Sequence, residues 1–263
     1  VDAGTREAIT AIGRAGRTRR FSCALARNEG EVIEAMRLRW RIFADEMNGA
    51  HLPHNGGLEG DRFDPFCDHL LVRDTHSGLV VGTYRILGDH GARAAGGYYS
   101  ETEFRLEGLR NLGGRVMEVG RACVDPCYRN GAVISTLWAG LFKYILTGKY
   151  DYVIGCGSIS LKSGARPAAA ICRRIAREHP CPADLRAVPL CRFPVDEFAG
   201  SNQEPEIDTD AALPPLIKGY LRLGAWICGD PAWDPLFNTA DLLIVLPVAG
   251  LDRRYFSRYL REL

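Results

Sequence analysis

The segment from Val116 to Phe142 constrains the fold most, because a predicted strand, a turn and an uncharged helix follow one another there. The strand covers Val116 to Val124, the turn-rich residues are Asp125 to Gly131, and Ala132 to Phe142 carries no charge. In a strand–loop–helix unit, the backbone N–H groups of the loop and of the helix N-terminus can hold a phosphate group. The segment therefore predicts a holder for a phosphorylated acyl carrier.

Two charged residues, Glu118 and Arg121, interrupt the apolar residues of that strand. Charges are costly to bury unless they are paired, so the two residues are expected to have partners. One interpretation places a carboxylate and a guanidinium beside a reacting thioester. The other is a buried ion pair with a purely structural role, and the strand alone leaves both open.

Composition is that of an ordinary globular protein, with 46% hydrophobic and 25% charged residues. No apolar run reaches the length that spans a bilayer, and the N-terminus lacks the apolar core of a secretory signal. Nine cysteines without a Cys-x-x-Cys pair do not resemble a disulfide framework. We therefore expect a soluble or peripheral cytoplasmic protein with reduced thiols.

Strands and helices alternate along the chain after an initial hairpin. The expected strands are 21–27, 69–73, 79–87, 116–124, 152–158, 187–193 and 241–246, and the expected helices are 29–47, 132–148, 164–178, one that begins at Pro214-Pro215 and one from Leu251 onward. This order predicts an α/β fold with a mixed central sheet and helices on both faces. We expect a basic N-terminal extension over residues 1–20 and a single domain over residues 21–263.

Charge is distributed unevenly along the chain. The stretch from Ser160 to Arg177 carries basic residues and no acid, whereas Asp196 to Asp210 carries acids and no base. A basic run is either a solvated face or a surface that recognises an acidic partner. The acidic stretch is expected to be a surface loop, and the terminal segment 252–263, with arginines among aromatic residues, is a candidate contact with an anionic membrane on its cytoplasmic side.

Metal, nucleotide and nucleic-acid classes receive no support from the motifs. His51-x-x-His54 with Cys67 and His69 is a poor ligand set, because two of these residues lie in a Gly/Pro loop that fixes no geometry. Neither a Gly-x-Gly-x-x-Gly fingerprint after a strand nor a Walker-type loop is present. We therefore expect no metal, no nucleotide cofactor and no nucleic-acid partner.

Four stretches of the chain are distinctive, namely Leu38–Phe43, Phe63–Val72, Glu118–Ile134 and Pro214–Ala225. Together they resemble a known family, the GNAT-like bacterial ornithine-acyl carrier protein N-acyltransferases of ornithine-lipid synthesis. The resemblance implies a GNAT-like fold and transfer of a (3-hydroxy)acyl chain from acyl carrier protein to the α-amine of L-ornithine, which gives lyso-ornithine lipid.

A more distant resemblance links the chain to acyl-homoserine lactone synthases. Their ordered pattern matches Arg39, Phe43, Asp61, Asp64, Arg85, Glu118 and Arg121. From this resemblance and the chemistry of amine attack on a thioester, we expect catalytic roles for Glu118, Arg121, Asp64 and Arg39. Substrate contacts are expected from Asp61, Arg85, Phe43 and Trp40.

The loop after the strand departs from the usual GNAT pattern, because Arg129-Asn130-Gly131-Ala132 has alanine in place of glycine at the expected fourth position. A carrier protein presents only one phosphate, so a loop that lacks this glycine is compatible with its 4'-phosphopantetheine arm. No permanently bound cofactor is expected. The basic residues expected to dock the carrier protein are Lys162, Arg166, Arg173, Arg174 and Arg177. Two alternatives remain, namely the same chemistry on another amine (glycine, another amino acid or a lactone-forming acceptor) and a non-catalytic module that binds a carrier protein or a membrane.

Overall fold

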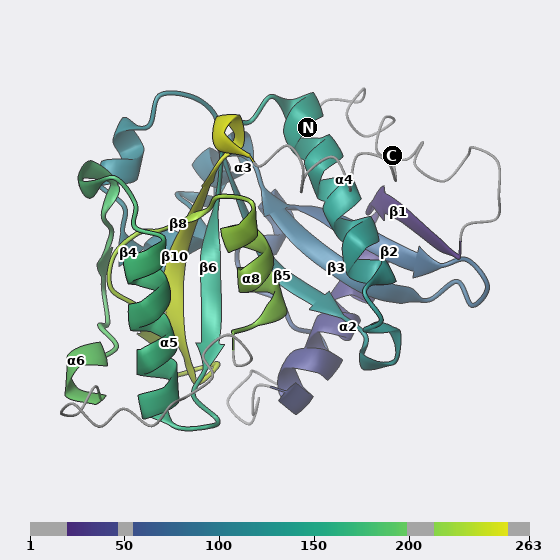
Figure 1. Ribbon diagram of the computed structural model, residues 1–263. Helices are drawn as coiled ribbons and strands as arrows, with labels where there is room; N and C mark the ends of the chain where they lie inside the picture. The colour runs from purple at the N-terminus through teal and green to yellow at the C-terminus, as the bar shows by residue number, and fades with distance from the viewer. Residues whose placement is uncertain (1–19, 47–54, 199–212, 252–263) are drawn as a thin grey trace. The chain divides into compact units, whose positions relative to one another are not determined.

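A computed structural model describes residues 20–46, 55–198 and 213–251 (Figure 1). Its described residues fall into two compact units, one of 20–97 and 115–150 and the other of 98–114 and 151–251. Each unit combines strands and helices, and the predicted α/β class with a mixed sheet is confirmed. The predicted extension 1–20 and terminal helix lie outside the described residues except for their inner ends.

Four antiparallel strands form the sheet of the first unit, in the order β1, β2, β3, β5. β2 and β3 are the predicted hairpin, and β3 is buried along its whole length. The strands and helices of this unit are β1 (Phe21–Leu25), α2 (Glu29–Glu46), η3 (Asp64–Phe66), β2 (Asp68–Asp74), β3 (Val80–Leu87), α3 (Asp89–Ala95), β5 (Val116–Val124), η6 (Pro126–Tyr128) and α4 (Ala132–Gly148).

Helices α2 and α4 cover opposite faces of this sheet (Figure 1). Gly82 pairs with Val72, and a Cβ atom on Gly82 would meet Val133 of α4. Arg73 follows Val72 and so points to the other face, where its guanidinium pairs with Glu34 of α2 at 2.5 Å. β3 is therefore buried because a helix lies on each side of it.

The second unit has its own antiparallel ladder, in which β10 pairs with β6, β8 and β9. A two-stranded sheet of β4 and β7 accompanies it. The elements are η4 (Tyr99–Thr102), β4 (Phe104–Arg105), η5 (Gly108–Asn111), β6 (Tyr152–Ser160), α5 (Ala165–Glu178), η7 (Ala183–Leu185), β7 (Val188–Pro189), α6 (Val195–Phe198), α8 (Pro215–Arg222), β8 (Trp226–Ile227), β9 (Ala232–Asp234), β10 (Thr239–Pro247) and η8 (Val248–Gly250).

Most predicted elements match the structure to within one or two residues, and the largest difference concerns the strand expected over 187–193. Only Val188–Pro189 is a strand there. Pro189 and Pro194 lack the backbone N–H that a ladder requires, so a long strand cannot form in this segment. None of the helices in the described part of the chain is long and apolar enough to cross a bilayer.

Close packing at Gly140 generates a testable prediction. A Cβ atom at this position of α4 would lie 2.5 Å from Cys23 Sγ and 3.1 Å from Leu70. Gly140→Ala should lower the free energy of unfolding by about 1–3 kcal/mol, because overpacking outweighs the better helix propensity of alanine. Urea unfolding measures the loss. Adding Cys23→Ala should recover part of it in a double-mutant cycle, and strictly additive effects would contradict the predicted clash.

Candidate functional site

Three carboxylates lie on the short segment between α2 and β2, namely Glu59, Asp61 and Asp64. The segment holds its own shape, because Asp64 Oδ2 accepts a hydrogen bond from the Asp61 backbone N at 2.7 Å. Asp61 Oδ1 in turn accepts one from the Phe63 backbone N at 2.8 Å. Pro65 then fixes the first turn of η3. The carboxylates are therefore positioned by local backbone contacts.

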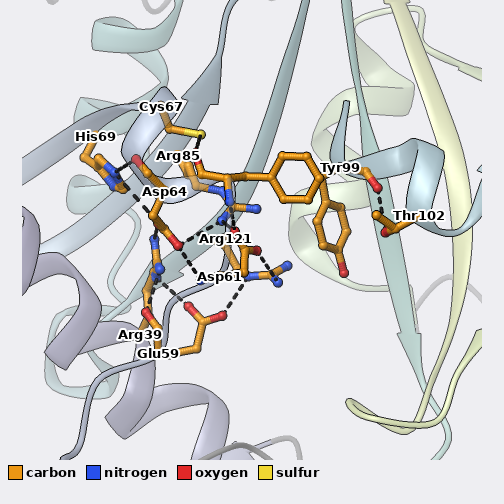
Figure 2. Close-up of polar contacts among 11 residues, drawn as sticks. Arg39, Glu59, Asp61, Asp64, Cys67, His69, Arg85, Tyr99, Thr102 and Arg121 are labelled. Carbon is orange, nitrogen blue, oxygen red and sulfur yellow. Dashed lines mark hydrogen bonds and ion pairs between the residues drawn. The ribbon is translucent and has the colours of Figure 1, made fainter. Parts of the chain in front are cut away.

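Arg39 of α2 is fully buried and meets two of these carboxylates. Its Nε lies 2.6 Å from Glu59 Oε2, and its Nη1 donates to Asp64 Oδ1 at 2.8 Å. Its Nη2 donates to the Glu59 backbone O at 2.6 Å. Figure 2 shows this guanidinium between the two carboxylates.

Arg85 of β3 and Arg121 of β5 complete the pairing. Arg85 Nη1 lies 2.7 Å from Asp61 Oδ1 and 3.2 Å from Asp64 Oδ2. Arg121 Nε lies 2.9 Å from Glu59 Oε1, and its Nη2 lies 3.1 Å from Asp61 Oδ2. Each carboxylate thus bridges two arginines (Figure 2). The result is a closed charge ring in the order Arg39, Glu59, Arg121, Asp61, Arg85, Asp64.

Formal charges balance in this charge ring, because three guanidinium groups alternate with three carboxylates. Burial opposes ionisation of Asp64, yet Arg39 and Arg85 outweigh it and hold the pKa of that carboxyl at about 2. Burial also lowers the pKa of His69, whose Nε2 lies 3.3 Å from the Asp64 backbone O. His69 is therefore neutral at pH 7, and the positive charge of the site comes from the arginines.

A β-bulge in β5 brings Arg121 into the ring. Gly120 lies opposite Arg85 and Cys123 opposite Thr83, so β5 carries one residue more than β3 between these pairs. Arg121 adopts a left-handed backbone with φ 53° at this point. In a regular strand, Glu118 and Arg121 would point to opposite faces, because they are three positions apart. The extra residue of the bulge instead places Arg121 on the same face of the sheet as Arg85.

Glu118 lies on the same face, because it is opposite Leu87, two positions from Arg85. Its side chain is buried. Burial raises the pKa of the Cys67 thiol to about 12, and the negative charges of Asp64, Asp61 and Glu118 contribute to that rise. Glu118 therefore acts on the same thiol as two carboxylates of the charge ring and lies near that ring.

The other predicted substrate contacts, Phe43 and Trp40, lie on α2 within one turn of Arg39. Phe43 is buried, and Trp40 is half-buried beside Gly57, where a Cβ atom would lie 3.7 Å from its ring. The structure thus brings the six charged residues of the sequence pattern to one face of the sheet. A substrate role for the two aromatic residues stays a prediction.

Residues Arg129 to Ala132, predicted to hold phosphopantetheine, are exposed at the start of α4. Gly131 is the N-cap residue with φ 93°, and Asn130 Oδ1 accepts a hydrogen bond from the Ala132 backbone N at 3.1 Å. Arg129 Nε donates to the Val124 backbone O at 3.0 Å. The loop therefore presents a helix N-terminus to solvent, where an anion is favoured.

The predicted docking residues lie on or just before α5, in the second unit. Lys162, Arg166 and Arg177 are exposed, whereas Arg173 and Arg174 are half-buried. Arg174 Nε also pairs with Glu178 at 2.9 Å. Lys162, Arg166 and Arg177 are therefore more accessible to a partner than Arg173 and Arg174 are.

Glu59 is the residue that sequence reasoning missed. The sequence pattern contains three arginines (Arg39, Arg85, Arg121) but only two aspartates to pair with them. That imbalance is the signal that a third carboxylate is needed. The structure shows that Glu59, in the spacing Glu59-x-Asp61-x-x-Asp64, fills this position.

Comparisons with known proteins give consistent results. A family model described as an acetyltransferase (GNAT) domain matches residues 38–139. A protein named L-ornithine N(alpha)-acyltransferase from Agrobacterium fabrum is 38% identical over 260 residues, covering 93% of this chain and 86% of that protein. Proteins of the same name from Rhizobium meliloti and Brucella abortus are 37% and 36% identical over 93% of this chain, and the matches cover 86% and 90% of those proteins.

Among solved structures, similarity extends to FeeM, an N-acyl amino acid synthase from uncultured soil microbes. It is 14% identical with a TM-score of 0.48, and the match covers 88% of this chain and 93% of that one.

The charge ring predicts a large stability cost for removing one member. Glu59→Gln keeps the shape of the side chain but leaves Arg39 and Arg121 with an uncompensated buried charge. We expect a loss of about 3–5 kcal/mol in the free energy of unfolding, measured by urea titration. The control is Glu34→Gln, which breaks the half-exposed pair with Arg73 and should cost about 1 kcal/mol or less. Similar losses in both variants would contradict the buried ring.

Proposed function

This chain belongs to the family of the L-ornithine N(alpha)-acyltransferases, and we propose that it transfers a (3-hydroxy)acyl chain from acyl carrier protein to the α-amine of L-ornithine. The product would be lyso-ornithine lipid. The observation that carries the proposal is identity of 36–38% over 93% of the chain to proteins of that name. The charge ring supports it by supplying groups that suit an amino-acid substrate.

Amine attack on a thioester requires a free base, so a proton must leave the substrate ammonium. We assign this task to Glu118, acting directly or through a water molecule. The residue is buried on the face of the sheet that carries the charge ring. A buried carboxylate in a site of fixed charges keeps its orientation while the nitrogen approaches the carbonyl carbon. No covalent enzyme intermediate is needed.

The charge ring is not uniformly buried, and this difference suggests which members meet substrate. Arg39 is 0% exposed, whereas the Arg121 and Asp61 side chains are 13% and 23% exposed. A guanidinium binds a carboxylate through a bidentate fork, so Arg121 suits the amino-acid carboxylate. Asp61 suits a substrate ammonium. Arg39 and Asp64 then act as positioning residues that hold Arg121 and Asp61 in place.

The bulge in β5 also suits the oxyanion of the tetrahedral intermediate. A bulge leaves its extra residue outside the ladder, so a backbone N–H between Val119 and Ala122 is available in this proposal to donate to that oxyanion. The nitrogen loses a second proton, and the thiolate of the carrier arm leaves as the intermediate collapses. Of the two protons that the substrate ammonium gives up, one passes through Glu118 or water to the leaving sulfur and the other to solvent.

Acyl carrier protein is proposed as donor because the loop Arg129-Asn130-Gly131-Ala132 lacks the glycine that the usual GNAT pattern has at its fourth position. The exposed N-terminus of α4 offers an anion position suited to the single phosphate of 4'-phosphopantetheine. The basic face of α5 would dock the acidic carrier protein. A cytoplasmic location with peripheral contact to an anionic membrane through residues 252–263 stays a prediction, since that segment lies outside the described residues.

The proposed chemistry predicts that Glu118→Gln and Arg121→Ala each lower the rate of acyl transfer by about 100-fold or more, because base and substrate clamp are lost. The assay detects N-acylornithine by mass spectrometry after incubation with 3-hydroxyacyl carrier protein and ornithine. Matched controls are the exposed Glu29→Gln and Arg93→Ala, which should retain activity.

Circular dichroism checks that each variant is folded. Near-normal turnover in a folded Glu118→Gln or Arg121→Ala variant would remove that residue from the chemistry. A panel of free amino acids tests the acceptor, and preference for glycine or another amine over ornithine would overturn the proposed substrate.

The donor proposal predicts that charge reversal on α5 weakens binding of acyl carrier protein specifically. Arg166→Glu with Arg177→Glu should raise KM for the acylated carrier protein about tenfold with little change in kcat, because complementary charge steers association. Activity with the acyl-pantetheine thioester, which lacks the protein, should not change. The control Arg105→Glu reverses an exposed charge elsewhere in the second unit. Equal effects on both donors would argue against docking at this helix.

A further inference from the structure

Three carboxyl groups converge in the second unit, on elements other than those that carry the charge ring. Glu103 follows η4, Asp234 ends β9, and Asp241 lies in β10. One oxygen from each lies within 4.8 Å of the other two. Asp241 is 4% exposed. We call these three residues the acidic triad.

Counter-charges for the acidic triad are missing from the described residues. Within the ranges that the structure describes, no arginine, lysine or histidine forms an ion pair with any of the three carboxylates. Both Glu103 oxygens and Asp241 Oδ1 are buried and have no hydrogen-bond partner of good geometry there. The charge ring of the first unit has the opposite arrangement, because every carboxylate in it bridges two cations.

A hydroxyl group next to the acidic triad provides a second observation. Thr239 lies two residues before Asp241 on β10, so both side chains point to the same face. Its side chain is fully buried, and its Oγ1 lies beside the Asp241 carboxyl without a hydrogen bond of good geometry among the described residues. A buried hydroxyl oxygen of this kind has a lone pair available for a further ligand.

Electrostatics of the acidic triad favour a positive occupant. Three carboxyl groups whose oxygens lie within 4.8 Å of one another repel each other when ionised. A divalent ion among the oxygens would offset most of that formal charge.

We propose that Glu103, Asp234, Asp241 and the Thr239 hydroxyl form a binding site for a divalent cation of the size of Ca²⁺. Calcium binds oxygen ligands at about 2.3–2.6 Å, so oxygens on opposite sides of the ion lie about 4.6–5.2 Å apart. The oxygens of the triad all lie within 4.8 Å of one another, so one ion can reach all three. Magnesium dehydrates reluctantly and usually keeps several waters, so a buried set of protein oxygens favours calcium.

Such an ion would act as a structural link inside the second unit. It would join the segment after η4 to β9 and β10, which are far apart in the sequence. Ser158 lies opposite Asp241 on β6 and faces the same side of the sheet, so a hydroxyl of the neighbouring strand flanks the ligand. This role is independent of acyl transfer.

Calorimetry and thermal unfolding of the full chain test the proposal. After treatment with EDTA and removal of the chelator, CaCl₂ should bind with one-to-one stoichiometry. At about 100 times the dissociation constant, the ion should raise Tm by roughly 5–10 °C. MgCl₂ at the same concentration should produce a smaller shift. Absence of a calcium response, or an equal magnesium response, would overturn the proposed site.

Variants locate the binding site. Glu103→Gln and Asp234→Asn affect the less buried members and should abolish the calcium-dependent rise in Tm. The matched control Glu197→Gln removes an exposed carboxylate of the same unit and should leave the response intact. If either ligand variant unfolds, the calcium titration of the other decides the outcome. An unchanged response in Glu103→Gln or Asp234→Asn would place calcium elsewhere and overturn the proposal.

Discussion

The alternating ring of three arginines and three carboxylates is the interaction on which the first unit depends. A fully buried guanidinium such as that of Arg39 is tolerated only when opposite charges surround it. Because each carboxylate bridges two arginines, the ring ties together α2, the segment before β2, and the strands β3 and β5. The half-buried members, Asp61 and Arg121, are the two that we propose to contact substrate, and the ring holds both in place.

The two units use buried carboxyl groups differently. In the first unit, arginines neutralise Asp64 and keep the pKa of that carboxyl at about 2. In the second unit, burial and the charge of Asp241 raise the pKa of Glu103 to about 9. A buried carboxyl group is therefore ionised in one setting and in need of a proton or a cation in the other.

Sequence reasoning identified the class of fold, most element boundaries and six of the charged residues near the site. It did so because periodicity and turn residues are local signals, and because Arg39, Asp61, Asp64, Arg85, Glu118 and Arg121 match a known order. It could not identify Glu59, since the pairing of an arginine with a particular carboxylate depends on tertiary structure. The acidic triad was equally hidden, because Glu103, Asp234 and Asp241 share no local pattern.

Arg121 adopts φ 53°, a backbone conformation that costs an ordinary side chain free energy and that glycine adopts readily. A glycine here would relax the main chain while deleting the guanidinium that meets Glu59 and Asp61. Local conformational preference and the needs of the site thus select different amino acids at one position. Loss of one ring member costs about 3–5 kcal/mol, whereas a strained backbone residue costs about 1–3 kcal/mol, so arginine is the more stable choice here despite its unfavourable main chain.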